Sequence, residues 1–154
     1  MKNCGISYVI ERHEFWWNYL LENCAVPNGF DTRLPKIEWF DSRSDTAAFA
    51  GYYDCKYNLR YVLSELEEYD TTVCHEICHT FTKRVVYKNS FIPRKKDHHG
   101  QLWSYFYNVV CGAERGRYHN YKRPEMTEEV KALREVLRLK EKIKKLAAEI
   151  KVPE

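Results

Sequence analysis

Two histidines four residues apart constrain this chain more than any other feature of its sequence. The segment His75-Glu76-Ile77-Cys78-His79 fits the pattern HExxH. On an α-helix these histidines lie one turn apart, about 40° around the axis, and can grip one zinc ion. Glu76 lies to the side of the pair, where its carboxylate can take a proton from a water molecule that zinc activates. The pattern therefore predicts a helix that carries both metal ligands and a base.

The other residues of this helix favour the metal interpretation over two ordinary polar histidines. At about 100° per residue, the apolar side chains fall in one stripe and the histidines fall on the opposite side, facing a cleft. The stripe contains Cys74, Ile77, Cys78, Phe81 and Val85. A competing hypothesis makes Cys74 and Cys78 the metal ligands. They point into the stripe, so buried free cysteine is the preferred interpretation.

A catalytic zinc site needs a third protein ligand and a position open to water. Val85 occupies the place that the compact HExxHxxGxxH pattern gives to its third histidine, so that scheme fails here. The remaining candidates are His98, His99, Glu114 and His119. His99 stands with Gly100 directly before a predicted helix, where a ligand can be held rigidly and glycine lets the backbone approach closely.

The N-terminal half predicts one helix and one sheet. Apolar periodicity indicates a helix over 8–23, which ends before Pro27. Three short segments rich in aromatic and branched residues, 34–40, 47–53 and 58–63, predict three strands of one sheet. With the helices, these strands indicate the α+β class.

The HExxH helix is expected to be capped by Asp70 and to run to about Val86. A third helix is expected from about Gly100 to Cys111, with Gly112 as its stop. Its expected apolar face contains Leu102, Tyr105, Phe106, Val109 and Val110.

A long C-terminal helix is expected from Pro124 to about Ile150, about 40 Å in length. Its apolar residues alternate spacings of four and three: Ala132, Val136, Leu139, Ile143, Leu146 and Ile150. Packing along its own domain is slightly preferred over a short coiled coil with a second copy or a partner, because the stripe covers only about three heptads. The expected organisation is one domain over 1–120 and a basic helical extension over 121–154.

Composition excludes a structureless chain and limits the number of domains. The 154 residues are 44% hydrophobic and 15% aromatic, which suits one folded core. No signal peptide or membrane-length apolar run is present, so a cytosolic or nuclear protein without a membrane partner is expected. The cysteines are then expected to be reduced, and a zinc ribbon is not expected because no CxxC pair exists.

The sequence resembles the SprT-like zinc metallopeptidases, a family that includes bacterial SprT proteins and Spartan-type DNA-protein crosslink proteases. The likeness covers residues 14–110 in the pieces FWWNYLLENC, LPKIEWF, AFAGYYD followed by NLRYVLS, VCHEICHTF, and HHGQLW. The family's third ligand is the histidine of an HGxx-aromatic pattern, which residues 99–103 match. The resemblance implies a zincin-like fold, one zinc ion on His75, His79 and His99, and Glu76 as the general base.

The resemblance also implies peptide-bond hydrolysis in proteins that are bound or crosslinked to DNA. A net charge of +3 does not by itself argue for a nucleic-acid partner, but bases are clustered on both sides of His99. The candidate DNA contacts are Lys88, Arg94, Lys95 and Lys96. The alternative is a non-catalytic DNA-associated module with structural zinc, against which Glu76 argues because such a site needs no carboxylate beside its ligands.

Overall fold

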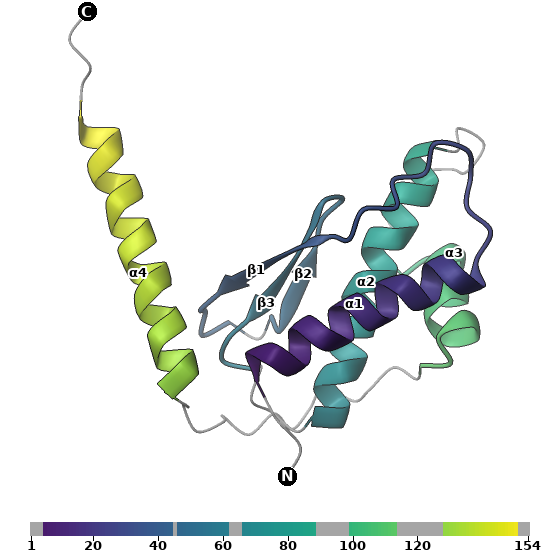
Figure 1. The fold of residues 1–154 in the computed structure, drawn as a ribbon, viewed down its shortest axis with the longest axis horizontal. Coiled ribbons are helices and arrows are strands. Elements are labelled where there is room, and N and C mark those ends of the chain that lie inside the picture. Colours follow the sequence, from purple (N-terminus) through teal and green to yellow (C-terminus); the bar gives the residue numbers. More distant parts are fainter. Residues whose placement is uncertain (1–4, 45, 62–65, 89–98, 114–127, 151–154) are drawn as a thin grey trace, which may run out of the picture.

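Helix α2 (Leu66–Lys88) is the central element of the computed structural model of this chain (Figure 1). It contacts helix α1, strands β2 and β3, and the short helical segment that follows it in the sequence. The structure describes residues 5–44, 46–61, 66–88, 99–113 and 128–150, and at 66–69, 88, 129 and 130 it describes the backbone alone. Within these residues the protein is α+β.

A mixed sheet of three strands lies beside α2. Strands β1 (Lys36–Phe40), β2 (Ala48–Ala50) and β3 (Asp54–Asn58) are ordered β1-β3-β2. Strand β3 is central, because it pairs in parallel with β1 and antiparallel with β2. The prediction of one three-stranded sheet is therefore confirmed.

The third strand does not lie at 58–63, where the sequence predicted it. Strand β3 ends at Asn58, the next three residues form a turn, and 62–63 lie outside the described residues. Cys55 and Tyr57 of β3 are buried and Lys56 between them is exposed. This alternation is that of a strand, but three polar residues among five made it less conspicuous than the aromatic and branched run that follows.

Helix α1 (Ile6–Asn23) is connected to the sheet through the buried His13. Its Nε2–H donates to the carbonyl oxygen of Pro35 at 2.7 Å, and its Nδ1 accepts from the Tyr57 hydroxyl at 2.9 Å. A carbonyl only accepts, so Nε2 carries the proton, and in the neutral imidazole Nδ1 is then the acceptor. Burial, partly offset by the Pro35 hydrogen bond, lowers the pKa of His13 to about 4.

Asp70 lies inside α2 and does not cap it, contrary to the prediction. Helix α2 begins four residues earlier, at Leu66. The Asp70 carboxylate instead accepts hydrogen bonds from Arg12 at 2.7 Å and from the Trp16 indole at 2.9 Å. This acid therefore joins α2 to α1.

The predicted helix after Gly100 is present, but half of it has a different winding. Helix α3 (Gln101–Ser104) continues directly into the π-helix η1 (Tyr105–Val110). The buried side chains are Trp103, Phe106 and Tyr107, whereas Tyr105 and Val109 of the predicted apolar face are exposed. The wider i→i+5 turns of a π-helix shift the phase of the side chains, which a wheel of 3.6 residues per turn does not reproduce.

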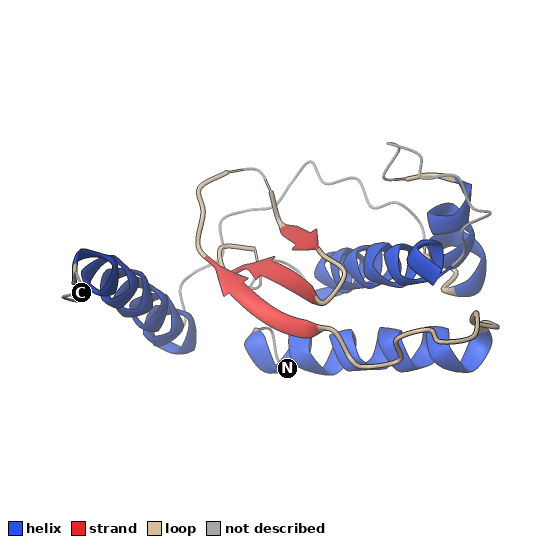
Figure 2. Ribbon diagram, turned by 90° about the horizontal axis from the view of Figure 1, so that it is seen from above, coloured by secondary structure: helices blue, strands red, loops and turns tan. Residues whose placement is uncertain are grey.

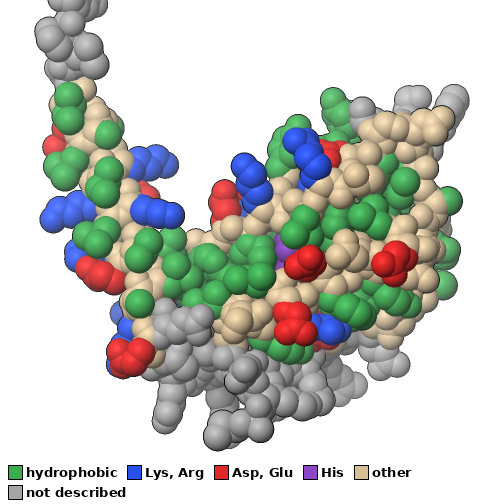
Figure 3. All heavy atoms as spheres, in the orientation of Figure 1, with side chains coloured by type: hydrophobic (Ala, Val, Ile, Leu, Met, Phe, Trp, Pro, Cys, Tyr) green, Lys and Arg blue, Asp and Glu red, His purple; other side chains and the backbone are tan. Residues whose placement is uncertain are grey.

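Helix α4 (Glu128–Glu149) stands apart from the other helices in both ribbon views (Figures 1 and 2). Its partly buried Leu133 and Leu137 pack toward the core near β1. Most of the predicted stripe is exposed: Val136, Leu139, Ile143, Leu146 and Ile150. Apolar side chains lie along the helix among its basic residues (Figure 3). The prediction that this helix packs along its own domain is therefore wrong beyond its first turns. A contact with a second copy or a partner stays a prediction.

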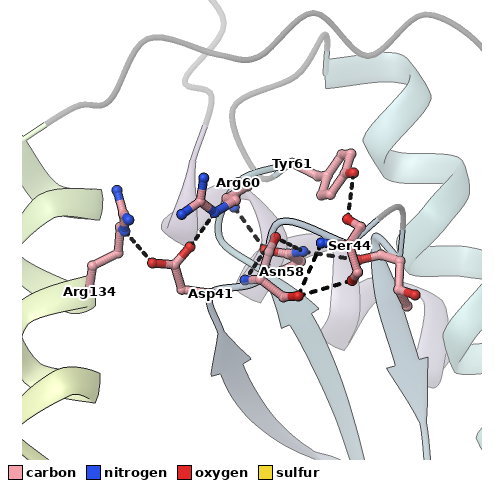
Figure 4. A network of polar contacts seen from close by, with 8 residues as sticks. Asp41, Ser44, Asn58, Arg60, Tyr61 and Arg134 are labelled. Carbon is pink, nitrogen blue, oxygen red and sulfur yellow. Dashed lines mark hydrogen bonds and ion pairs between the residues drawn. The ribbon is translucent and has the colours of Figure 1, made fainter.

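An acid at the end of β1 connects α4 to the sheet (Figure 4). The Asp41 carboxylate accepts hydrogen bonds from Arg60 at 2.6 Å and from Arg134 of α4. Asn58, fully buried nearby, donates its side-chain amide to the carbonyl oxygen of Thr46 at 3.0 Å.

In the described part of the chain, no helix is long and apolar enough to cross a membrane.

The buried Arg84 of α2 joins the helix to the segments before β1 and after β2. Its side chain is 1% exposed, lies over the ring of Trp17, and donates to the carbonyl oxygens of Asp31 and Tyr52, each at 2.8 Å. It also donates to the carbonyl oxygen of Arg33 at 2.5 Å. One planar guanidinium thus satisfies carbonyls from two loops.

We expect Arg84→Met to lower the free energy of unfolding by about 3 kcal/mol, because it leaves buried carbonyls without a donor. Urea denaturation measures the change. The matched control is Arg33→Met, since Arg33 pairs with the same Asp31 but its side chain is 77% exposed. Its expected effect is much smaller, because solvent screens an exposed ion pair. Equal losses in the two variants would contradict the assignment of Arg84 as the connecting residue.

Candidate metal centre

Three imidazoles converge on one side of α2. The Nε2 atom of His75 lies 3.0 Å from Nε2 of His79 and 3.1 Å from Nε2 of His99. One ligand nitrogen from each of the three lies within 4.8 Å of the others. His75 and His79 face the same side because they are one helical turn apart, and His99 reaches them from the residue before Gly100, which precedes α3.

These distances fit a shared cation better than hydrogen bonding among the rings. An imidazole nitrogen carries either one lone pair or one proton, so Nε2 of His75 cannot make a good hydrogen bond to both neighbours. A tetrahedral zinc ion with bonds of about 2.0–2.1 Å places its nitrogen ligands about 3.3–3.4 Å apart. The observed separations are within a few tenths of an ångström of that value. The donor set therefore suits zinc.

Trp103 packs against all three imidazoles, a role that the sequence did not indicate. Its ring stacks on His79 with a centroid distance of 5.1 Å and lies 4.7 Å from His75 and 4.5 Å from His99. Its indole N–H donates to the carbonyl oxygen of His75 at 3.2 Å. The available signal was the aromatic position that closes the HGxx-aromatic pattern. Trp103 thus fixes the orientation of the three imidazoles.

Tyr107 of η1 supports this arrangement from the core. It is fully buried, stacks on Trp103 with a centroid distance of 4.7 Å, and meets His75 edge-on at 5.7 Å. Offset and edge-on aromatic pairs are favoured by the charge distribution of the rings. The α3–η1 segment therefore supplies the aromatic wall behind the cluster, and the residues just before it supply the third histidine.

Glu76 follows His75 in α2 and is 9% exposed. Burial raises the pKa of its carboxyl to about 7, and the nearby Lys83 partly offsets this rise. A divalent cation at the neighbouring histidines would lower this pKa again. A carboxyl whose pKa lies near neutrality can both take up and release a proton, as general acid–base chemistry requires.

The turn between β2 and β3 is held to α2 next to Glu76. Thr80 donates to the carbonyl oxygen of Gly51 at 2.7 Å, and Lys83 donates to that of Ala50. A Cβ at Gly51 would meet Asp54 Oδ1 at 2.6 Å, so a larger residue here would displace the Asp54 side chain. Thr80 and Lys83, which belong to the polar row of α2, therefore hold one edge of the sheet beside the candidate centre.

The predicted stripe on the other side of α2 is confirmed. Cys74, Ile77, Cys78 and Phe81 are fully buried, and Val85 is 8% exposed. Cys74 and Cys78 are free thiols that do not face the histidines. A cleft beside the histidines stays a prediction.

The other predicted site residues fall outside the described residues. They are the alternative third ligands His98, Glu114 and His119, and the candidate DNA contacts Arg94, Lys95 and Lys96. For Lys88 the backbone ends α2 and the side chain is not described. Among the predicted site residues that are described, the structure brings together His75, His79 and His99, and Glu76 follows His75 in α2.

Comparison of the chain with protein-family models, with curated proteins and with solved structures found no match. The described residues define an α+β protein with a small mixed sheet and a candidate three-histidine metal centre. Its chemistry is therefore argued from the site itself.

We expect His75→Ala, His79→Ala and His99→Ala each to remove one equivalent of zinc from the protein, because a three-ligand site does not tolerate losing a member. Metal analysis after gel filtration measures this. His98→Ala is the matched control and should keep the full complement. Loss of zinc from His98→Ala with retention in His99→Ala would overturn the choice of third ligand.

Proposed function

We propose that this protein is a zinc-dependent peptidase in which His75, His79 and His99 hold the metal and Glu76 is the general base. The observation that carries the proposal is the convergence of three imidazoles on the helix that carries the buried Glu76. The Nε2 atoms of His79 and His99 lie 3.0 and 3.1 Å from Nε2 of His75. The resemblance of the motifs to SprT-like metallopeptidases supports the same reaction.

Zinc, when bound, is a Lewis acid that lowers the pKa of water and polarises a carbonyl group. Glu76 takes the proton of the attacking water and delivers it to the leaving amine. Trp103 and Tyr107 keep the imidazoles in place and exclude water from behind them. Three protein ligands would leave one position open to water or substrate, as in catalytic zinc sites.

Glu76 favours catalysis over a purely structural metal site. A structural site gains nothing from a carboxyl that is 9% exposed and whose burial costs free energy. A base with a pKa near 7 is useful for proton transfer at neutral pH. This residue therefore argues against the alternative of a non-catalytic zinc-binding module.

We expect Glu76→Gln to retain zinc and fold while peptide hydrolysis falls by about 10²–10⁴, because an amide keeps the shape but cannot accept the proton. Cleavage of an unfolded protein substrate, followed by mass spectrometry, measures the loss. Glu38→Gln is the control, since the Glu38 side chain is 52% exposed. Near-normal cleavage by Glu76→Gln would remove this residue from the mechanism.

We propose further that the substrates are proteins bound or crosslinked to DNA. The support is the family resemblance together with the bases that flank His99 in sequence, Lys88, Arg94, Lys95 and Lys96. Phosphate contacts by such side chains release counterions and do not read bases.

We expect the protein to bind mixed-sequence DNA at low salt and to lose affinity steeply toward physiological salt. A variant with Arg94, Lys95 and Lys96 changed to glutamine should bind more weakly and show a smaller salt slope, by about one unit for each phosphate that is no longer neutralised. Fluorescence anisotropy measures both. The control changes Lys140, Lys142 and Lys144 of α4 to glutamine. No binding at low salt, or equal effects of the two variants, would leave a peptidase without this DNA contact.

A further inference from the structure

Helix α2 carries two interleaved pairs of metal-binding side chains. Cys74 and Cys78 are four residues apart, as are His75 and His79, and the pairs are offset by one residue. One residue is about 100° around an α-helix, so each pair presents its own side. The histidines form the centre described above, and the cysteines face the core.

A third thiol meets the cysteine pair from another segment. Cys111 directly follows η1, and its Sγ lies 3.9 Å from Sγ of Cys78. The three sulfur atoms of Cys74, Cys78 and Cys111 all lie within 4.8 Å of one another. Two of these thiols are fully buried and Cys111 is half-buried. The cluster is separate from the three histidines and plays no part in the proposed reaction.

We propose that Cys74, Cys78 and Cys111 form a second metal site, which binds a thiophilic cation of the zinc class through three thiolates. Thiols bind such ions in the deprotonated state, so loading releases their protons to solvent. Soft thiolate ligands favour zinc or copper(I) over magnesium or calcium.

The sulfur geometry fits a cation better than a disulfide. Zinc–sulfur bonds of about 2.3 Å in a tetrahedral site separate the sulfur atoms by about 3.8 Å. The Cys78–Cys111 separation of 3.9 Å agrees with that value, whereas a disulfide needs about 2.05 Å. Apolar packing accounts for the burial of Cys74 and Cys78 in the stripe. It does not require a third thiol from a separate segment at the same point.

The site has a side from which an ion can enter. Cys111 is half-buried, and so is Cys24, which follows the last residue of α1. Cys24 lies close enough to Cys111 for the charge of that thiolate to contribute to raising its pKa, after burial. Cys111 is therefore the member of the cluster that is partly open to solvent, which gives an ion a path of entry.

A cation at this position would clamp the segment that carries the third histidine. His99 lies just before α3, and Cys111 lies just after η1. The histidine centre holds the beginning of this segment against α2, and the thiolate site would hold its end. The second ion is therefore structural, and its loss should weaken metal binding at the histidines without removing their ligands.

Cobalt(II) titration of the reduced, metal-free full chain tests the proposal, because cobalt bound to thiolates gives an intense near-ultraviolet charge-transfer absorption that imidazole ligands do not give. We expect two equivalents of cobalt per chain and this absorption in the wild type. Cys111→Ala should lose the charge-transfer absorption and one equivalent. His99→Ala should lose the other equivalent and keep the absorption.

Cys55→Ala is the matched control, because Cys55 is a fully buried free thiol on β3 outside the cluster. It should keep both equivalents and the absorption. Absence of charge-transfer absorption in the wild type, or its persistence in Cys111→Ala, would overturn the second site. This result does not depend on proteolysis, so an inactive protein can still carry the thiolate site and an active one can lack it.

Discussion

Three imidazole nitrogens converge on one point, and the arrangement of the surrounding residues depends on this convergence. Each nitrogen has only one lone pair or one proton, so Nε2 of His75 cannot make a good hydrogen bond to both His79 and His99, at 3.0 and 3.1 Å. Rings placed this way must be held by their surroundings until a cation joins them. The structure provides that support through the buried aromatic wall of Trp103 and Tyr107.

The position of α2 provides the second part of this support. Its apolar stripe is buried in the core. Its polar row binds the carbonyl oxygens of Gly51 and Tyr52, which follow β2. Arg84 extends the same row to the loop before β1. Because the helix is engaged through both its apolar stripe and these polar side chains, rotation about its axis is resisted and the histidines keep their direction. The residues that hold α2 are therefore as important to the site as the ligands.

Sequence reasoning located the site more accurately than it located the elements around it. The HExxH spacing and the stripe through Ile77 are local helical patterns, so they were predictable. Position in the sequence left several candidates for the third ligand, and the family resemblance selected His99 among them. Trp103 was present in the pattern, but its contact with all three imidazoles depends on tertiary packing.

The errors have a common physical cause, which is that tertiary contacts override local preference. Asp70 has the chemistry of a cap, yet it is used between α1 and α2, where Arg12 and Trp16 meet it. The phase of η1 follows from its π-winding, which apolar spacing alone does not reveal. Strand β3 gains its stability from two neighbouring strands, so its mixed sequence suffices for a central position.

Glu76 shows how the candidate centre and its base depend on each other. Burial raises the pKa of its carboxyl to about 7, because the charged form is poorly solvated there. A cation at the histidines favours the ionised form, and the ionised form in turn favours the cation, since linkage is reciprocal. Below its pKa this carboxyl takes up a proton and loses its attraction for the metal. Acid also competes for the imidazole nitrogens, because a protonated ring nitrogen cannot bind a metal, so low pH opposes both the carboxylate and a cation at the histidines.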